Sequence, residues 1–366
     1  MEAYGEWLLA NPRGGSLYVW DPAVGGRAIT LYGAPAAMLS FFITAERYIV
    51  ALGTAGDSMQ MAWPDQLDPN AWVAKTTNTA NQSRKIIGGN FIVAGGQVRN
   101  QTSLIWTDTN VFLHQWRTDD LVFTTTGLAS KCGLIGPNAF TMMGESVYWV
   151  GDGHFWEWDG GLSEIPSDEI NEWFFSRLDR SQTDKIIVGS IAPFNELIIL
   201  YQETGEAEVG HYLLYDIKDK IWSTGTVQRT AWSDRGLFDS PMATDSAGAI
   251  WDHELGVDGA GAAIPAWITA APIDIDAGEQ ALDIMGFLPN FARQTGTLSL
   301  YVLTRQRAAD TPTSSGPFSL NTAGDTVDIR EAGRMAGYKI QSDAVGGDFR
   351  LGVCRVDVLA GGARRP

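Results

Sequence analysis

Short segments in which apolar and polar residues alternate follow one another along most of the chain. Alternation with a period of two is typical of β-strands that bury one face. Many of these segments end at Gly or at Asp-Pro, which favour turns. The pattern therefore predicts an all-β protein. The clearest predicted strands before residue 220 cover 17–20, 47–52, 85–87, 91–94, 103–106, 111–114, 146–150, 154–158, 185–189, 196–201 and 210–215.

An aromatic residue near an Asp recurs along these strands, in steps of 36 to 57 residues between Trp20 and Trp251. Propeller blades are roughly 40–50 residues long. The repeat predicts a β-propeller of about six blades, of which the first can be incomplete at its N-terminal side. Because a catalytic site is normally asymmetric, a recurring carboxylate favours a structural role, such as accepting backbone N–H bonds in a blade turn. The expected blade-turn anchors are Asp21, Asp108, Asp159, Asp216 and Asp252.

One segment departs from the β pattern. After Pro166, Ser167 is a candidate N-cap, and two acidic residues follow it in the first turn. Apolar residues then recur on one helical face. We expect a single amphipathic helix over 168–180, inserted between blades, where it either closes the side of the propeller or serves an interface. The apolar face consists of Ile170, Trp173, Phe174 and Leu178.

The composition of the chain and the spacing of its predicted strands change near residue 255. Residues 254–266 are rich in Gly and Ala and form the best linker candidate. Strands without helices follow, at a spacing typical of a small β-sandwich. We therefore expect a propeller over 1–255 and a β-sandwich assembly domain over 256–366. The predicted sandwich strands cover 267–269, 281–286, 297–303, 326–330, 338–341 and 350–358.

The charge of the chain is divided in the same way. The net charge is −17, but residues 267–366 hold 10 Lys or Arg and 11 Asp or Glu, against 16 and 32 in residues 1–266. Such an acidic chain does not attract nucleic acid through its overall field. The excess of acidic residues either serves only to keep the protein soluble or provides a surface that repels a polyanion passing close by. Cys132 and Cys354 are expected to be reduced and buried, and a disulfide between them is the alternative.

The sequence offers little catalytic chemistry. Four histidines occur without metal-ligand spacing, and nucleophile-elbow, P-loop and dinucleotide-binding motifs are absent. We expect neither an enzyme nor a cofactor. Abundant carboxylates and 14 tryptophans leave one alternative open, a carbohydrate-active or carbohydrate-binding propeller of a tail or cell surface. Another alternative is a scaffold propeller that binds a partner peptide.

Specific strings resemble a known family. The stretch from Trp63-Pro64-Asp65 to Asp68-Pro69-Asn70-Ala71-Trp72 is similar to a segment of the tail nozzle proteins of short-tailed double-stranded DNA bacteriophages, also called tail tubular or packaged-DNA-stabilisation proteins. The order and spacing of further strings agree with that family. These strings are Gly133-Leu134-Ile135-Gly136-Pro137, Tyr148-Trp149-Val150-Gly151, His211-Tyr212, Gly333-Arg334-Met335, Phe349-Arg350-Leu351-Gly352 and Gly362-Ala363-Arg364-Arg365.

The resemblance implies a structural virion protein in the phage tail, assembled in the host cytoplasm. Its subunits would form a ring, as a homohexamer, below the head-to-tail adaptor and next to tail fibre or needle proteins. The ring would seal the packaged genome and conduct double-stranded DNA during ejection without binding it tightly. We expect the sandwich to make much of the ring contact. The candidate residues for salt bridges between subunits, or else within the sandwich, are Arg330, Arg334, Arg350 and Arg355.

Overall fold

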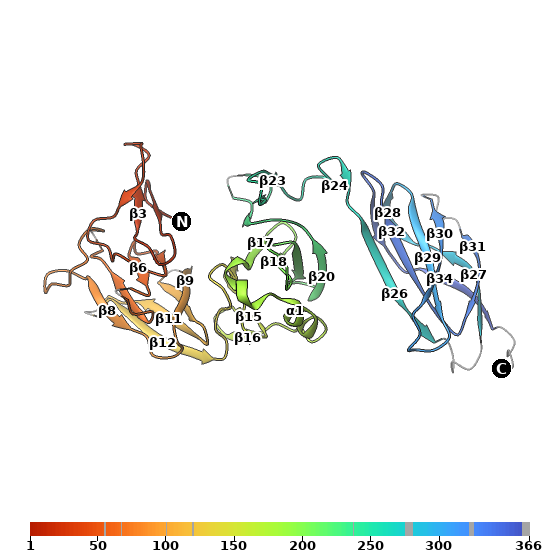
Figure 1. Ribbon diagram of the computed structural model, residues 1–366, viewed down its shortest axis with the longest axis horizontal. Coiled ribbons are helices and arrows are strands. Elements are labelled where there is room, and N and C mark those ends of the chain that lie inside the picture. Colours follow the sequence, from red (N-terminus) through yellow and green to blue (C-terminus); the bar gives the residue numbers. More distant parts are fainter. Residues whose placement is uncertain are drawn as a thin grey trace. The chain divides into compact units, whose positions relative to one another are not determined.

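The protein folds as two compact all-β units. The computed structural model describes residues 1–54, 56–66, 68–99, 101–118, 121–236, 238–274, 281–321 and 326–360. The first unit is Met1–His253 and the second is Glu254–Pro366, so the division falls at 253/254 where the sequence suggested 255/256. Figure 1 shows the small sheets of the first unit and the longer strands of the second. The predicted all-β class is confirmed.

The first unit consists of antiparallel sheets in which each strand pairs with the next one along the chain. Four-stranded meanders of this kind are the building blocks of β-propellers. We number the described sheets 1 to 6 in chain order. Their strands are β1 (Glu2–Tyr4), β2 (Trp7–Ala10), β3 (Tyr18–Trp20) and β4 (Ile29–Thr30); β5 (Ser40–Ile43), β6 (Ile49–Leu52), β7 (Gln60–Trp63) and β8 (Asn81–Lys85); β9 (Ile92–Arg99), β10 (Thr102–Thr107), β11 (Asn110–Trp116) and β12 (Phe123–Ser130); β13 (Phe140–Met143), β14 (Ser146–Val150), β15 (Phe155–Trp158) and β16 (Leu162–Glu164); β17 (Ile187–Ile191), β18 (Glu196–Tyr201), β19 (His211–Asp216) and β20 (Ile221–Thr226); and β21 (Ala231–Ser233), β22 (Met242–Thr244) and β23 (Ile250–Asp252).

The apolar cores of this unit lie between consecutive sheets. One cluster joins sheets 1 and 2, a second joins sheets 2 and 3, and a third extends over sheets 3 to 5. First strands contact each other directly, as in the pairs β1 with β5, β5 with β9, β13 with β17 and β17 with β21. Between sheets 3 and 4, the Trp106 and Phe140 rings lie 4.7 Å apart. Each sheet thus buries its faces against its neighbours, which is why tryptophans concentrate in the strands.

The first hairpin of sheets 1 to 5 repeats one backbone feature. Each turn contains a residue with positive φ, a conformation that Gly and Asn adopt most readily. Sheets 1, 4 and 5 use Gly or Asn at this position, whereas sheets 2 and 3 use Arg and Gln. These residues are Gly5 (φ 64°), Arg47 (φ 67°), Gln101 (φ 63°), Gly144 (φ 62°) and Asn195 (φ 59°).

Some strand predictions need correction. Sheet 1 has four strands, because Gly5 turns the chain and lets Glu2–Tyr4 pair with β2, although the sequence left open that this first unit of the repeat lacks its N-terminal part. The described three-stranded sheet of this unit is sheet 6. The strand predicted over 85–87 ends at Lys85, since it forms the last residue of β8.

The inserted helix is shorter than predicted. Helix α1 (Asn171–Arg177) begins after Ile170 and is followed by a 3-10 segment, η1 (Arg180–Lys185). Ser167 does not cap it with its side chain; instead its backbone carbonyl accepts bonds from the N–H groups of Ile170 and Asn171. The apolar face is as predicted, because Phe174 and Leu178 are buried in the core over sheets 3 to 5.

The second unit contains antiparallel sheets that enclose one apolar core. One sheet has the order β26-β32-β29-β30 and another has the order β31-β27-β34. Buried side chains from both sheets form a single cluster. The predicted strand over 350–358 is divided in two around Gly352 and Val353. The strands are β24 (Asp258–Gly259), β25 (Ala262–Ala263), β26 (Ala266–Asp274), β27 (Leu282–Leu288), β28 (Phe291–Thr295), β29 (Leu298–Arg305), β30 (Thr313–Leu320), β31 (Val327–Gly333), β32 (Met335–Ser342), β33 (Asp348–Leu351) and β34 (Arg355–Ala360).

Arg13 connects three sheets of the first unit. Its Nη1 donates to the carbonyl of Leu39, just before β5, at 3.2 Å and to that of Val93, in β9, at 2.9 Å. We expect Arg13→Ala to lower the free energy of unfolding by about 1–2 kcal/mol, because two carbonyls lose a charged donor. Urea denaturation followed by tryptophan fluorescence measures this. Arg27→Ala, at an exposed position, is the control and should change stability by less than about 0.5 kcal/mol.

Candidate functional site

Three of the five recurring aspartates accept backbone bonds within their own turns, and the other two bond residues farther away along the chain. Asp21, Asp159 and Asp216 each follow or end the third strand of a sheet. Each accepts a hydrogen bond from the backbone N–H two residues ahead, at 2.9 to 3.0 Å. This geometry stabilises a tight turn.

Asp108 does not occupy the equivalent place. It follows β10, the second strand of sheet 3, and its carboxylate accepts bonds from the backbone and the side chain of Asn90 at 2.8 and 2.6 Å. The sequence repeat treated Asp108 as equivalent to the other aspartates, but the preceding Trp106 lies on the second strand of its sheet and not on the third. Asp252 ends the third strand of sheet 6 and accepts a bond from the Ser240 hydroxyl at 3.5 Å.

The histidines occupy structural positions. His154 Nδ1 lies 2.6 Å from Oε1 of Glu164, the last residue of β16, and His211 Nε2 lies 2.9 Å from Glu206 Oε1. His253 packs on Trp232 and accepts a bond from Arg229 Nε at 2.8 Å. Burial and the Arg229 charge lower the pKa of His253 to about 4. Within the described ranges, no three His, Cys, Asp or Glu residues are grouped to hold a metal, and no helix could cross a membrane.

The four candidate arginines are exposed on the second unit. Arg330 lies on β31, Arg350 on β33 and Arg355 on β34, while Arg334 lies between β31 and β32. The described residues provide no ion pair for Arg330, Arg350 or Arg355. The string Gly362-Ala363-Arg364-Arg365 lies outside the described residues.

A cavity lies between sheets 1 and 2. Its volume is about 510 Å³, which is in the range of small-molecule sites. Three turns build it: the β1–β2 hairpin, the β5–β6 hairpin and the loop after β7. None of the five recurring aspartates lines it. The lining residues are Tyr4, Gly5, Glu6, Trp7, Glu46, Arg47, Gln66 and Pro69.

Two aromatic rings lie along one side of this cavity. The Tyr4 and Trp7 ring centroids are 6.4 Å apart with a tilt of 33°. Trp7 Nε1 donates to Asp21 Oδ2 at 3.1 Å, so a recurring aspartate also fixes the orientation of this indole. Both rings are half-buried, which leaves part of each surface open to a ligand.

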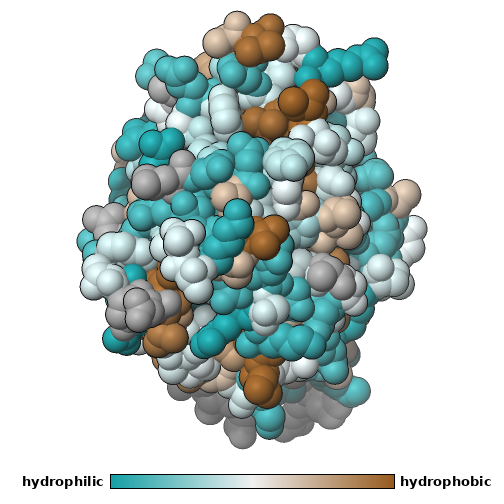
Figure 2. Space-filling view, turned by 90° about the vertical axis from the view of Figure 1, so that its left-hand side faces the viewer, coloured by the Kyte–Doolittle hydropathy of each residue, from teal (hydrophilic) through white to brown (hydrophobic). Residues whose placement is uncertain are grey.

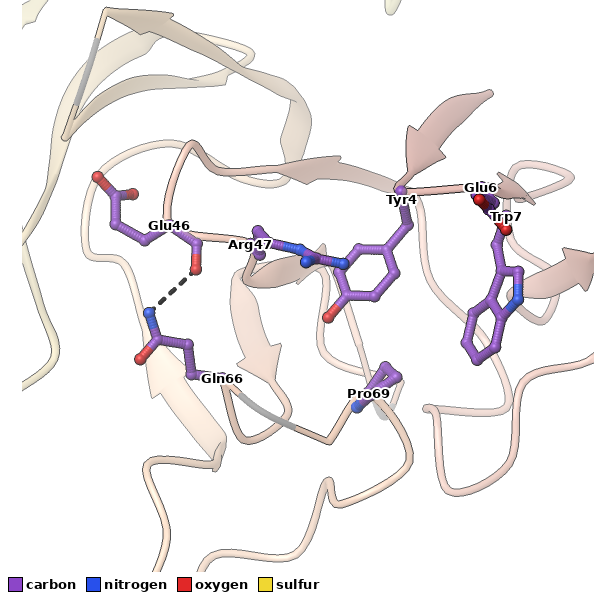
Figure 3. Close-up of a pocket in the computed structure, with 8 residues that line it drawn as sticks. Tyr4, Glu6, Trp7, Glu46, Arg47, Gln66 and Pro69 are labelled. Carbon is purple, nitrogen blue, oxygen red and sulfur yellow. Dashed lines mark hydrogen bonds between the residues drawn. The ribbon is translucent and has the colours of Figure 1, made fainter.

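The Arg47 guanidinium faces the Tyr4 ring, at 5.1 Å from its centroid (Figure 3). The Arg47 charge lowers the pKa of the Tyr4 hydroxyl, but burial is the larger effect, so that pKa lies above its usual value. The hairpin holds Arg47 in place through its backbone N–H, which donates to the Thr44 carbonyl at 2.9 Å.

Another side of the cavity comes from the loop after β7, through Gln66 and Pro69. Gln66 Nε2 donates to the Glu46 carbonyl at 3.1 Å, and the loop closes through the bond from Trp72 Nε1 to the Pro69 carbonyl at 2.8 Å. Trp72 is buried in the core between sheets 1 and 2. The Glu46 carboxylate points away from the Tyr4 ring in Figure 3, so the cavity does not present a facing pair of carboxylates.

The sequence did not reveal this cavity. The sequence predicts Arg47 as the first residue of a strand over 47–52, and Tyr4 and Trp7 belong to none of the predicted strands. The available signal was Gly5, which marks a turn between two aromatic residues.

Comparisons with known proteins give a fold likeness only. No family model matches the chain, and no curated protein matches it. It is similar to a solved structure of U3-55K, with 10% identity, 67% of this chain and 72% of that chain covered, and a TM-score of 0.41. It is also similar to the Cps50 (Swd1) β-propeller domain of Myceliophteria thermophila, with 10% identity, 68% of this chain and 80% of that chain covered, and a TM-score of 0.42. A third similar structure is YCF48 bound to D1 peptide, with 11% identity, 67% of this chain and 73% of that chain covered, and a TM-score of 0.40.

Proposed function

We propose that this chain is a subunit of the tail nozzle of a short-tailed double-stranded DNA phage. In this proposal sheets 1 to 6 are the blades of one six-bladed propeller, and the second unit is a β-sandwich that joins subunits into a hexameric ring. The ring lies below the head-to-tail adaptor, contacts fibre or needle proteins, and conducts and seals the genome. It is a virion component without enzymatic activity.

The division of charge is the observation that carries this proposal. Residues 1–266 have twice as many acids as bases, 32 against 16, whereas residues 267–366 are nearly balanced. Every phosphate that Lys or Arg neutralises adds a salt-dependent hold on DNA, so a conduit should offer few such contacts. The hydrophilic face in Figure 2, on which hydrophobic residues are scattered, agrees with a solvated propeller surface.

The resembling strings add support through their positions. The Trp63–Trp72 string closes sheet 2 onto sheet 1, and Gly133–Pro137 connects sheet 3 to sheet 4. These two strings thus lie where neighbouring sheets meet. The turn bonds of Asp21, Asp159 and Asp216 favour a structural role over catalysis.

Sedimentation velocity and negative-stain microscopy test the proposal. We expect rings with an axial opening at micromolar concentration, alone or after addition of the adaptor protein. We expect the double variant Arg330→Glu and Arg355→Glu to shift the population toward monomers, because both positions are exposed on the second unit without an ion pair among the described residues. Arg235→Glu, exposed on the first unit, is the control. Monomers alone under both conditions would contradict the ring.

A further inference from the structure

The Arg47 side chain is an unused cation in a strongly acidic protein. The chain holds 43 Asp or Glu against 26 Lys or Arg, yet the described residues give the Arg47 guanidinium neither an ion pair nor a hydrogen bond. It lies over the Tyr4 ring, and its N–H groups remain available as donors among the described residues. A guanidinium with free N–H groups can bind a carboxylate through two parallel bonds.

The other groups of the cavity complement a polyhydroxylated ring. The half-buried Tyr4 and Trp7 rings offer flat surfaces for its C–H face. Gln66 uses Nε2 on the Glu46 carbonyl, so its Oε1 remains as an acceptor, and the exposed Glu6 carboxylate is a second acceptor. Acceptors pair with hydroxyl donors, which an ionised carboxylate alone does not supply.

We propose that the cavity between sheets 1 and 2 binds an acidic monosaccharide unit, a hexuronic acid, either free or at the end of a glycan. Its carboxylate pairs with Arg47, its ring lies against Tyr4 and Trp7, and its hydroxyls donate to Glu6 and Gln66. This site is independent of ring assembly, since all of its residues belong to the first two sheets of one subunit.

The hairpin provides a variant that separates binding from folding. Arg47 has a φ of 67°, and the equivalent residues of sheets 1 and 4 are glycines. Glycine adopts this conformation without steric cost, so Arg47→Gly should fold at least as well as the parent. Gln101→Gly makes the same change at the equivalent hairpin of sheet 3 and is the matched control.

Isothermal titration and saturation-transfer NMR on the full chain test the site, with D-glucuronate, D-galacturonate, D-glucose and inorganic phosphate as probes. We expect a uronate to bind at least tenfold more tightly than glucose. Arg47→Gly should weaken uronate binding about tenfold or more, the effect of losing one bidentate charged pair. Arg47→Lys should lose part of the affinity, because an ammonium lacks the planar fork. Gln101→Gly should bind like the parent.

Several results would overturn the assignment. Absence of uronate binding would remove the site, and equal affinity for glucose would remove the role of Arg47. Phosphate binding of the same strength as uronate would reduce it to a simple anion contact. None of these results bears on whether the chain forms a ring, so the site and the nozzle proposal can fail separately.

Discussion

The variant Gly136→Ala is expected to lower the free energy of unfolding by about 3 kcal/mol. Gly136 lies in the link from sheet 3 to sheet 4, and an added Cβ would come within 2.0 Å of the Thr183 carbonyl oxygen in η1. Because that obstacle is backbone, it cannot rotate away as a side chain would. Overpacking of this kind costs roughly 1–3 kcal/mol and sometimes more. Urea denaturation followed by circular dichroism gives the change directly.

The control for this variant is Gly236→Ala. A Cβ at Gly236 would meet nothing within 4 Å, and neither glycine has a positive φ, so the pair differs mainly in available space. Gly236→Ala should be neutral or slightly stabilising. Equal stability of the two variants would mean that the Thr183 segment yields without cost, and that the glycine of the Gly133–Pro137 string does not lock sheets 3 to 5 together.

The repeat of aromatic residues and aspartates was a good guide to the class of fold, because buried strands need apolar faces and tight turns need short acceptors. It was a poor guide to equivalence. Trp106 and Trp158 are both buried, but the first lies on the second strand of its sheet and the second lies on the third strand. Spacing alone cannot distinguish neighbouring strands of one meander, since both present the same alternation.

The cavity could not be found from sequence because its parts come from three separate turns. Tyr4, Arg47 and Gln66 meet only after sheet 1 has packed against sheet 2, which depends on Trp72 and the core around it. Local patterns describe strands and turns, whereas the approach of two hairpin turns is set by side-chain packing between sheets. The start of helix α1 likewise shows that a local sequence pattern does not fix which atoms form the hydrogen bonds. The Ser167 side chain was a suitable cap, yet its backbone carbonyl does the bonding.

Acid should destabilise the first unit through His114. This residue is 1% exposed, stacks on Phe123 at 4.4 Å and has Nδ1 2.8 Å from Thr125 Oγ1. Burial, together with the Arg84 charge, lowers the pKa of His114 to about 3. In the unfolded chain it is near 6.5, so the unfolded state binds more protons between these values. Stability therefore falls as the pH drops below about 6.5, and His114 contributes a loss of about 3 kcal/mol at pH 4.5.

His114→Phe should remove most of this acid dependence. Phenylalanine keeps the stacking on Phe123 and has no Nε2, an atom that His114 buries without a hydrogen-bond partner. The absolute stability at pH 7 is a weak test, because the change also leaves Thr125 without its ring partner. The slope of unfolding free energy against pH from 7 to 4.5 is the decisive quantity, since packing alone does not alter it. Ile105→Val, a packing change without a titrating group in the core cluster that holds Phe123, should retain the parent slope. If His114→Phe also retained that slope, the acid sensitivity would belong to other groups, of which His253 is the next with a lowered pKa.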